Sequence, residues 1–495
     1  MQTFKSVSFI DSNSGKSKAV SVSFTGKEQS LFDFANKLSS AEIRRLINIE
    51  SYEDLVNIAT TERRSVSQYI KVALEKYVEQ NPNIIAASDV TFKNSKDIPV
   101  QRWYPYIEGY SPDFVKALIC QYINEPCLIY EPFAGTGTTL LAADALGFST
   151  LYSEINPLLQ LLIEVKLFVL SLSNEAKIAL AESLRHHKQN LLKFSSKPSK
   201  DLLDNYIAVF KKSVYFPTPN LNRILSTRTY LDSVEDIGIK NILTVAVMAC
   251  LIPSSFLKKQ GDLRFKNEKE IAKGIPAFEN LLSEKLDEIS RDLFTISDTI
   301  QRSHQLLIDN AKELDSVVCE KIGAVISSPP YLNGTNYIRN TKLELWFLRQ
   351  LKSEKDLRSF RDKILTSGIN DVKVSNLLRD NLSDISETYK STIESLSNSA
   401  YDMRIPLMAK GYFSEMYTIF EKLSAKLTNG AKILLDLGDS IFNSIHVKTD
   451  IILIEILASL GYQLKERKVL RERRSKNGQA LSQVLIYLQY SQENV

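Results

Sequence analysis

A strand, a glycine-containing loop, a helix and a second strand follow one another between residues 127 and 154, and this unit constrains the fold most. The first apolar run ends at Pro132, which cannot continue a sheet ladder. Gly135 and Gly137 allow the backbone to take positive φ and to approach a ligand without a Cβ clash. The second strand ends at Glu154. The pattern predicts a parallel sheet with helices on both faces and a ligand crevice at the carboxyl ends of its strands.

Three kinds of ligand fit a loop of this type. The chain has no G-x-x-x-x-G-K-[ST] pattern, which disfavours a P-loop ATPase. Leu140 stands where the third glycine of a dinucleotide fingerprint belongs, which weakens that interpretation. S-adenosylmethionine remains: its carboxylate would meet the loop and the following helix N-terminus, and Glu154 would accept hydrogen bonds from its ribose.

A second constrained stretch follows the apolar residues 323–326, which predict a short buried strand. Pro329 and Pro330 must stop that strand, so Ser328 and Tyr331 are expected in a rigid turn at its carboxyl end. The Ser328 hydroxyl and the Pro329 carbonyl could accept hydrogen bonds from an exocyclic amino group, and the Tyr331 ring could stack on a base. A plain loop that closes a strand over a buried tyrosine is the alternative.

These stretches together resemble a known enzyme family. Residues 131–139, 153–157 and 327–331 are similar to the motifs of the amino-methylating DNA methyltransferases, which act on cytosine N4 or adenine N6, usually beside a restriction endonuclease. The resemblance extends from about Arg102 to Leu488. The serine form of S-P-P-Y looks like the cytosine-N4 branch, because the adenine branch more often has Asp or Asn at that position.

The resemblance implies a doubly wound, Rossmann-like α/β sheet with helical insertions, an N-terminal helical module and S-adenosylmethionine as the cofactor. It also implies that Asp309, after a further strand, contacts the adenine amino group of the cofactor. The expected catalytic residues are Ser328, Pro329, Pro330 and Tyr331. The expected cofactor-binding residues are Tyr104, Pro105, Glu131, Pro132, Phe133, Gly135, Gly137, Thr138, Thr139, Glu154, Asn156 and Asp309.

In the implied mechanism, duplex DNA is held through its phosphates, a base is flipped into the pocket, and its amine attacks the sulfonium methyl group. A cytosine-C5 mechanism is disfavoured, because the only Pro-Cys pair, Pro126-Cys127, precedes the glycine loop instead of following it. Two alternatives stay open: an amino-methyltransferase acting on adenine or on RNA, and a catalytically silent DNA-binding subunit.

The expected domains interrupt the catalytic fold twice. Residues 1–95 form a mainly helical module, 96–160 the first part of the core, and 161–300 a helical insertion that could read the target sequence. The S-P-P-Y part of the core spans 301–350, a second helical insertion spans 351–405, and 406–495 complete the core with a basic hairpin.

Cations in two segments are candidate phosphate contacts. One is a polar loop over residues 258–266, and the other is the hairpin after residue 467. A solvated surface is the competing interpretation of each. The expected DNA-binding residues are Asn336, Tyr337, Lys258, Lys259, Arg471, Arg473, Arg474 and Lys476.

Helical spacing over residues 65–78 predicts a helix capped by Ser65 or Ser67, and the preceding Arg63 and Arg64 faintly resemble a ribbon-helix-helix or helix-turn-helix module. A small helical docking domain is the alternative. The 495 residues include no apolar run of membrane-spanning length, and four scattered cysteines disfavour a zinc site or disulfide framework. We therefore expect a soluble, cytoplasmic protein with no metal. The resemblance implies a bacterial or archaeal cell, with double-stranded DNA and a separately acting cognate restriction endonuclease as partners.

Overall fold

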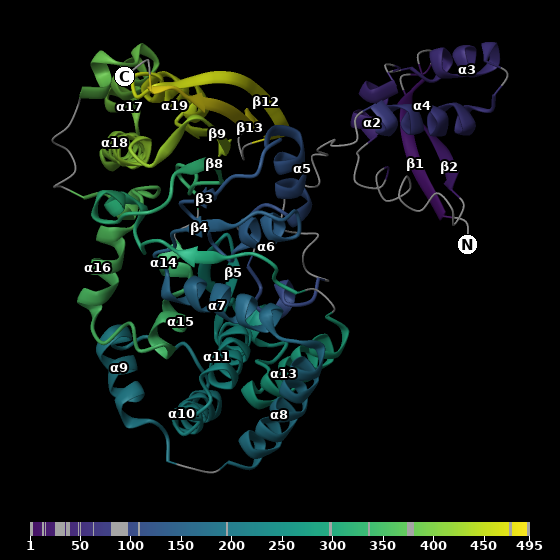
Figure 1. Cartoon of the computed structure of the whole chain (residues 1–495). Helices are drawn as coiled ribbons and strands as arrows, with labels where there is room; N and C mark the ends of the chain where they lie inside the picture. Colours follow the sequence, from purple (N-terminus) through teal and green to yellow (C-terminus); the bar gives the residue numbers. More distant parts are fainter. Residues whose placement is uncertain are drawn as a thin grey trace. The chain divides into compact units, whose positions relative to one another are not determined.

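The computed structural model describes most of the chain. The residues outside the description are 1–2, 12–13, 15, 25–34, 36–39, 48, 50, 63, 81–97, 107–108, 195–196, 297–298, 335–336, 374–380, 475–477 and 493–495. The chain divides into two compact units (Figure 1): Met1–Thr91 with Lys116–Tyr122, and Phe92–Val115 with Ile123–Val495. Among the described residues, no helix is both long and apolar enough to cross a membrane.

In its described residues, the first unit combines a β-hairpin with several helices, among them Lys116–Tyr122, the end of α5 (Pro112–Tyr122). Strands β1 (Thr3–Ile10) and β2 (Ser17–Phe24) pair antiparallel, and α2 (Ser40–Ile47), α3 (Tyr52–Thr61) and α4 (Val66–Gln80) follow. Ser65 caps α4 as predicted, because its Oγ accepts the Gln68 N–H at 3.2 Å. Alternate strand residues and one face of each helix meet in a shared core that includes Val7, Phe9, Val22, Ile43, Leu55, Ile70 and Leu74.

The second unit is built on a seven-stranded sheet in the order β12-β13-β9-β8-β3-β4-β7. Neighbouring strands from β9 to β7 are parallel, whereas β13 runs antiparallel to both β9 and β12. The bounds are β3 (Ile129–Glu131), β4 (Thr150–Tyr152), β7 (His304–Leu306), β8 (Ile322–Ser327), β9 (Leu427–Gly438), β12 (Tyr462–Arg474) and β13 (Ala480–Tyr490).

Helices cover both faces of this sheet. On one face, Tyr130, Val325 and Ile433 are buried in a cluster that includes residues of α17 (Glu387–Ser399), α18 (Arg404–Ser424) and α19 (Thr449–Ala458). On the other face, Tyr152 packs with residues of α6 (Thr138–Asp144) and α7 (Pro157–Ser171). This arrangement confirms the doubly wound, Rossmann-like α/β fold expected from the sequence.

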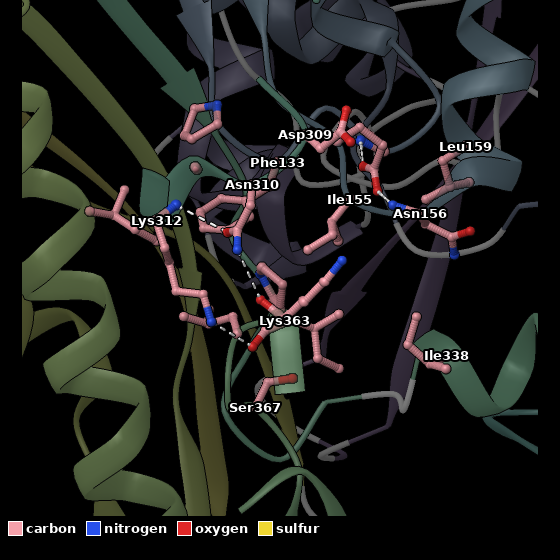
Figure 2. A pocket seen from close by; sticks show the side chains of 18 of the residues that line it. Phe133, Ile155, Asn156, Leu159, Asp309, Asn310, Lys312, Ile338, Lys363 and Ser367 are labelled. Carbon is pink, nitrogen blue, oxygen red and sulfur yellow. Dashed lines mark hydrogen bonds between the residues drawn. The ribbon is translucent and has the colours of Figure 1, made fainter. Parts of the chain in front are cut away.

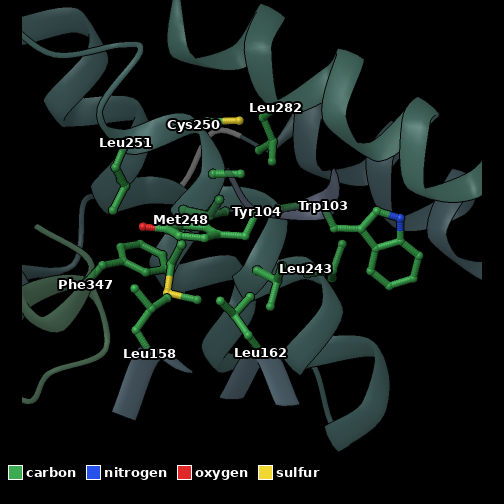
Figure 3. Close-up of a cluster of buried hydrophobic side chains, with 14 of the residues drawn as sticks. Trp103, Tyr104, Leu158, Leu162, Leu243, Met248, Cys250, Leu251, Leu282 and Phe347 are labelled. Atoms are coloured by element: carbon green, nitrogen blue, oxygen red, sulfur yellow. The ribbon is translucent and has the colours of Figure 1, made fainter. Parts of the chain in front are cut away.

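The predicted helical insertion forms a subdomain with its own core. Its elements are α8 (Asn174–Lys193), α9 (Lys200–Phe210), α10 (Thr218–Asp232), α11 (Ile237–Leu251), β5 (Leu257–Gln260), β6 (Asp262–Phe265), α12 (Glu268–Ile271) and α13 (Phe278–Thr295). Helix α11 is buried without interruption from Ile242 to Leu251, and Trp103, Tyr104 and Phe347 pack into the same cluster (Figure 3).

The remaining elements connect these layers. They are α5 (Pro112–Tyr122), α14 (Tyr337–Asn340), α15 (Lys342–Phe347), α16 (Glu354–Lys363) and the small hairpin of β10 (Ser440–Phe442) and β11 (Ile445–Val447). Short 3-10 turns occur at η3 (Gln101–Trp103), η4 (Ala311–Ser316), η5 (Ile369–Asp371) and η7 (Asn381–Asp384). Ser111 caps α5, because its Oγ accepts the Phe114 N–H at 3.1 Å, and Trp346 and Phe347 lie fully in the core.

Two local predictions were wrong. Residues 258–266 are not an open loop, because β5 and β6 pair antiparallel through a turn at Gly261 with φ of 72°. The sequence from Tyr412 to Leu427 predicts a helix closed at Asn429 and Gly430, but α18 stops at Ser424 and β9 already begins at Leu427. Leu427 pairs with Ile322 of β8, so the backbone here joins the sheet and does not continue the helix. The sequence pattern alone does not reveal this strand partner.

Candidate functional site

A pocket of about 810 Å³, partly open to solvent, lies at the carboxyl ends of the parallel strands. Residues after β3, β4, β7 and β8 line it, so the sheet itself gathers segments that are far apart in sequence. Figure 2 shows Phe133, Ile155 and Leu159 among its apolar walls and Asn156, Asp309 and Lys363 among its polar ones.

The glycine loop forms one wall. Gly135 and Gly137 have φ of 56° and 79°, a region in which an L side chain is strained. A Cβ on Gly137 would also lie 3.0 Å from Ile163 of α7, so the close packing of α7 against this loop requires glycine. Pro132, Phe133 and Gly135 line the pocket directly.

Glu154, after β4, holds this loop by its backbone. Its Oε2 accepts the Gly135 N–H and its Oε1 accepts the Asn156 N–H, both at 2.8 Å. Burial raises the pKa of the Glu154 carboxyl to about 7, and the two backbone bonds oppose that rise. Each carboxylate oxygen keeps a further lone pair, so Glu154 can still accept a hydroxyl from a ligand in the pocket.

Asp309 follows β7 and also lines the pocket. Gln160 of α7 connects it with Glu154, because the Gln160 Nε2 donates to Asp309 Oδ1 at 2.9 Å and to the Glu154 carbonyl at 2.6 Å. The pocket therefore has two acidic residues at a fixed relative position. Asp309 is the more exposed of the two.

The S-P-P-Y turn forms the opposite part of the lining through Ser328 and Pro330. Ser328 Oγ donates to Asp436 Oδ2 of β9 at 3.3 Å, and the Tyr331 hydroxyl donates to the same oxygen at 2.9 Å. A hydroxyl whose hydrogen is given to a carboxylate keeps its oxygen lone pairs free to accept. Burial raises the pKa of Asp436 to about 6, and these hydrogen bonds counteract the rise.

Tyr331 is fixed from two sides. Its ring packs so closely on Gly438 that a Cβ there would lie 2.7 Å from Tyr331 Cδ2, and its hydroxyl also accepts the Gln483 Nε2–H at 2.9 Å. The tyrosine hydroxyl thus faces the sheet, and base stacking by its ring stays a prediction. Neither Asp436 nor Gln483 is among the site residues expected from sequence, because nothing local marks a residue in a strand as the partner of a distant serine.

Glu131 connects the two motifs beneath the pocket. Its carboxylate accepts hydrogen bonds from Ser327 Oγ at 2.5 Å, from Thr139 Oγ1 at 2.7 Å and from the Tyr110 hydroxyl. Burial raises the Glu131 pKa to about 7 despite these bonds. Glu131 does not contribute to the described pocket lining, and its contacts indicate that it joins β3, β8 and α6.

Other expected cofactor residues lie around the pocket without contributing to that lining. Tyr104 is buried, with its hydroxyl donating to Glu344 Oε1 at 2.9 Å, and Pro105 is exposed. Tyr106, which was not among the expected residues, lines the pocket instead. Alternation within the aromatic loop is the only signal that could have identified it. Gly137, Thr138 and Thr139 form the buried start of α6.

The expected DNA-binding cations have different surroundings. Lys258 and Arg264 both pair with Glu270, at 2.8 Å each, and Lys259 lies 5.4 Å above the Tyr106 ring. In the other segment, Arg471 is half-buried, whereas Arg474 is exposed and donates to the Gly478 carbonyl. Asn336, Lys476 and the side chains of Tyr337 and Arg473 lie outside the described residues.

Comparison with known proteins identifies relatives in sequence. The chain is 25% identical over 422 residues to the Type II methyltransferase M.AvaI of Nostoc sp. and of Anabaena variabilis, covering 79% of this chain and 85% of the relative. It is 23% identical over 440 residues to the Type II methyltransferase M.BsoBI of Geobacillus stearothermophilus, covering 79% and 84%. No protein-family model matches the chain.

Among solved structures, the rRNA methyltransferase aviRa from Streptomyces viridochromogenes covers 78% of this chain and 86% of its own, at 8% identity and a TM-score of 0.26. A TM-score this low does not support any inference about this chain. The relation to Type II methyltransferases therefore rests on sequence, and the fold rests on the strand order described above.

Proposed function

We propose that this chain is an S-adenosylmethionine-dependent DNA methyltransferase of a restriction-modification system, and that it methylates the exocyclic amine of a flipped base, cytosine N4 being favoured. One observation carries the proposal: a single pocket is lined both by the glycine loop with Glu154 and Asp309 and by Ser328 and Pro330 of the S-P-P-Y turn. Sequence similarity to two kinds of Type II methyltransferase over about four fifths of the chain supports it independently.

The lining fits S-adenosylmethionine in its chemistry. Glu154 offers acceptors for ribose hydroxyls, Asp309 an acceptor for the adenine amino group, and Phe133, Ile155 and Leu159 apolar walls for the purine. The positive φ of Gly135 lets the backbone come close to a ligand without a Cβ in the way. When bound, the cofactor would supply an electrophilic methyl group on its sulfonium.

Ser328 is suited to hold the amine that is methylated. Its hydrogen is directed to Asp436, so its oxygen can accept a hydrogen from the base amine together with the Pro329 carbonyl. Such acceptors draw the amine lone pair out of conjugation with the ring and orient it towards the methyl group. The contribution of the chain is positioning and fixed dipoles, with no covalent intermediate on the protein.

DNA is proposed to be held by phosphate contacts from the β12–β13 hairpin and from the β5–β6 hairpin. The second of these lies near the pocket, because Lys259 contacts Tyr106 of the lining and Asn340 donates to the Gly261 carbonyl at 3.0 Å. A base inside a duplex cannot reach a pocket at the strand ends, so it must be flipped out before the reaction.

The experiment that tests the proposal incubates the protein with methyl-labelled S-adenosylmethionine and duplex DNA, digests the DNA to nucleosides and identifies the labelled product by mass spectrometry. N4-methylcytosine is the expected result. N6-methyladenine would keep the enzyme class and refute the cytosine assignment. Label found only in an RNA substrate would refute the proposed function. Label found in no nucleic acid would also refute it and would favour a catalytically silent DNA-binding subunit.

A further inference from the structure

Gln483 of β13 lies between the basic strand β12 and the catalytic turn. It is 3% exposed. Its Nε2 donates to both oxygens of Asp436, at 2.7 and 2.8 Å, and to the Tyr331 hydroxyl at 2.9 Å. Its Oε1 accepts the Arg471 Nε–H at 2.7 Å, across the directly opposed β12 and β13 residues. A continuous path of hydrogen bonds thus runs from Arg471 through Gln483 and Asp436 to Ser328.

The direction of the Gln483 amide is determined by chemistry. The Arg471 guanidinium can only donate, so it must face the amide oxygen. The amide nitrogen then necessarily faces the Asp436 carboxylate, which accepts, and the Tyr331 hydroxyl. Flipping the amide would bring donor against donor and acceptor against acceptor. Arg471 therefore sets which end of Gln483 the active site meets.

This path controls a buried charge. Asp436 is 2% exposed, and burial alone raises the pKa of its carboxyl, whereas the bonds from Gln483, Tyr331 and Ser328 and the positive charge of Arg471 lower it. The other titratable groups that face this region are Tyr110 and, through the Tyr110 hydroxyl, Glu131. Arg471 is the cation that acts on Asp436 among these groups.

We propose that Gln483 and Arg471 are positioning residues that hold the Asp436 carboxylate against Ser328 and Tyr331. The link to catalysis rests on the proposed function. The inference adds to that function by giving Arg471 a role inside the protein, as the partner of Gln483, in place of a phosphate contact. When the Asp436 carboxylate takes the serine hydrogen, that hydrogen is held away from the pocket and the lone pairs of Ser328 Oγ are left to accept from the substrate amine. The ionised form of Asp436 is the better acceptor for this hydrogen, and Gln483 and Arg471 favour that form.

The test measures the titration of Asp436 and the rate of methyl transfer in the full chain. Asp436 is followed by carbon NMR of protein labelled at aspartate carboxyls, with Asp436→Asn to assign the signal. The variants are Gln483→Leu, which removes both functions of the amide, Gln483→Glu, which keeps an acceptor for Arg471 but no donor, and Arg471→Met. Lys465→Met is the matched control, because it removes a cation from the same strand that donates only to Gln463 in the described contacts.

We expect the pKa of Asp436 to rise by roughly one unit in Gln483→Leu and Arg471→Met, and not in Lys465→Met. The acid limb of the kcat profile should move upward with it, and kcat near neutral pH should fall roughly tenfold or more in Gln483→Leu and Gln483→Glu. The affinity for S-adenosylmethionine should stay unchanged, since Gln483 is not part of the described pocket lining. The half-buried Arg471→Met variant keeps the test valid if Gln483→Leu does not fold.

An Asp436 titration identical to wild type in both Gln483→Leu and Arg471→Met would overturn the inference, as would full activity of Gln483→Glu. The proposed function and the positioning role can be refuted separately. If wild-type protein methylates no nucleic acid but the Asp436 titration shifts as expected, the proposed function falls and the positioning network stands. If wild-type protein methylates DNA and no variant shifts the titration, only the inference falls.

Discussion

At the scale of single residues, the pocket depends on buried charged groups that bind backbone. Glu154 accepts two backbone N–H groups beside the pocket. Lys166 of α7 is 4% exposed and donates to the Thr136 carbonyl of the glycine loop at 2.6 Å and to Gln101 Oε1 at 2.8 Å. These two side chains hold a short loop that has few side-chain contacts of its own. Substitution of either side chain should therefore change ligand affinity more than the rate of the chemical step.

Glu154→Gln should weaken S-adenosylmethionine binding roughly tenfold, because an amide offers one acceptor where the carboxylate offers two to backbone donors. The wild-type affinity should also rise with pH through about 7, where the Glu154 carboxyl ionises. Isothermal titration calorimetry at pH 6, 7 and 8 measures both effects. Glu164→Gln, an exposed position on α7, is the control. Equal affinities for wild type and Glu154→Gln would remove Glu154 from the cofactor site.

Ser328→Ala should lower kcat roughly a hundredfold while leaving DNA and cofactor affinity unchanged, because it removes an acceptor that matters in the transition state. Ser328→Thr keeps the hydroxyl and is expected to retain part of the activity. Single-turnover rates at saturating cofactor separate chemistry from binding. An unchanged kcat in Ser328→Ala would contradict the assigned role of the serine.

At the scale of elements, the β12–β13 hairpin divides its cations between two tasks. Arg471 donates to Gln483 of β13, and Arg467 pairs with Asp450 of α19 at 2.6 Å, so both are engaged within the protein. Arg474, near the turn, is exposed and contacts only the Gly478 carbonyl among the contacts described for it. Cations near the turn are therefore the better candidates for phosphate contacts than those at the middle of the strand.

Changing Arg473 and Arg474 together to Gln should reduce the slope of log K for DNA binding against log salt by about 0.9 for each DNA phosphate that these arginines neutralise. Fluorescence anisotropy with a duplex oligonucleotide at several salt concentrations measures the slope. Lys465→Met, on the same strand, serves as the comparison. A slope identical to wild type would exclude this end of the hairpin from the DNA interface.

At the scale of the whole molecule, four buried carboxyls have raised pKa values: about 7 for Glu131, Glu154 and Glu344 and about 6 for Asp436. The folded state binds more protons than the unfolded state between the ordinary carboxyl range and pH 7, so stability should fall as pH rises through that window. Burial lowers the pKa of Lys166 to about 7 and of Lys312 to about 8. Above pH 7 the unfolded state keeps more protons on these lysines, so stability should rise again towards their ordinary pKa.

The melting temperature of the full chain should therefore pass through a shallow minimum near pH 7. Glu344→Gln is the most informative variant, because Glu344 Oε2 has no hydrogen-bond partner among the described residues and the amide removes the buried charge. It should stabilise the protein at pH 8, by about 1–3 kcal/mol, and change nothing below the ordinary carboxyl pKa. Calorimetric scans from pH 4.5 to 9 check this, and a flat profile in wild type would contradict it.

Sequence by itself determined the parts of this protein that depend on neighbouring residues. Pro132 and the S-P-P turn stop strands, Gly135 and Gly137 take positive φ, and Ser65 and Ser111 cap helices, because each effect acts within a few bonds of backbone. The same local signals predicted the doubly wound sheet. Local patterns predicted Ser328 and Glu154 as site residues, the family resemblance added Asp309, and the structure brings all three to one pocket.

Tertiary structure alone decided which distant groups these residues meet. Asp436 and Gln483 lie 108 and 155 positions after Ser328 in sequence, and Lys166 of α7 reaches Thr136 of the glycine loop. A buried charge must find hydrogen-bond partners or it destabilises the fold, and the order of strands in the sheet determines which partners are near. For this reason the sequence indicated Ser328 as the proposed acceptor for the substrate amine, while only the packed sheet revealed Asp436 and Gln483 as the carboxylate and the amide linked to it by hydrogen bonds.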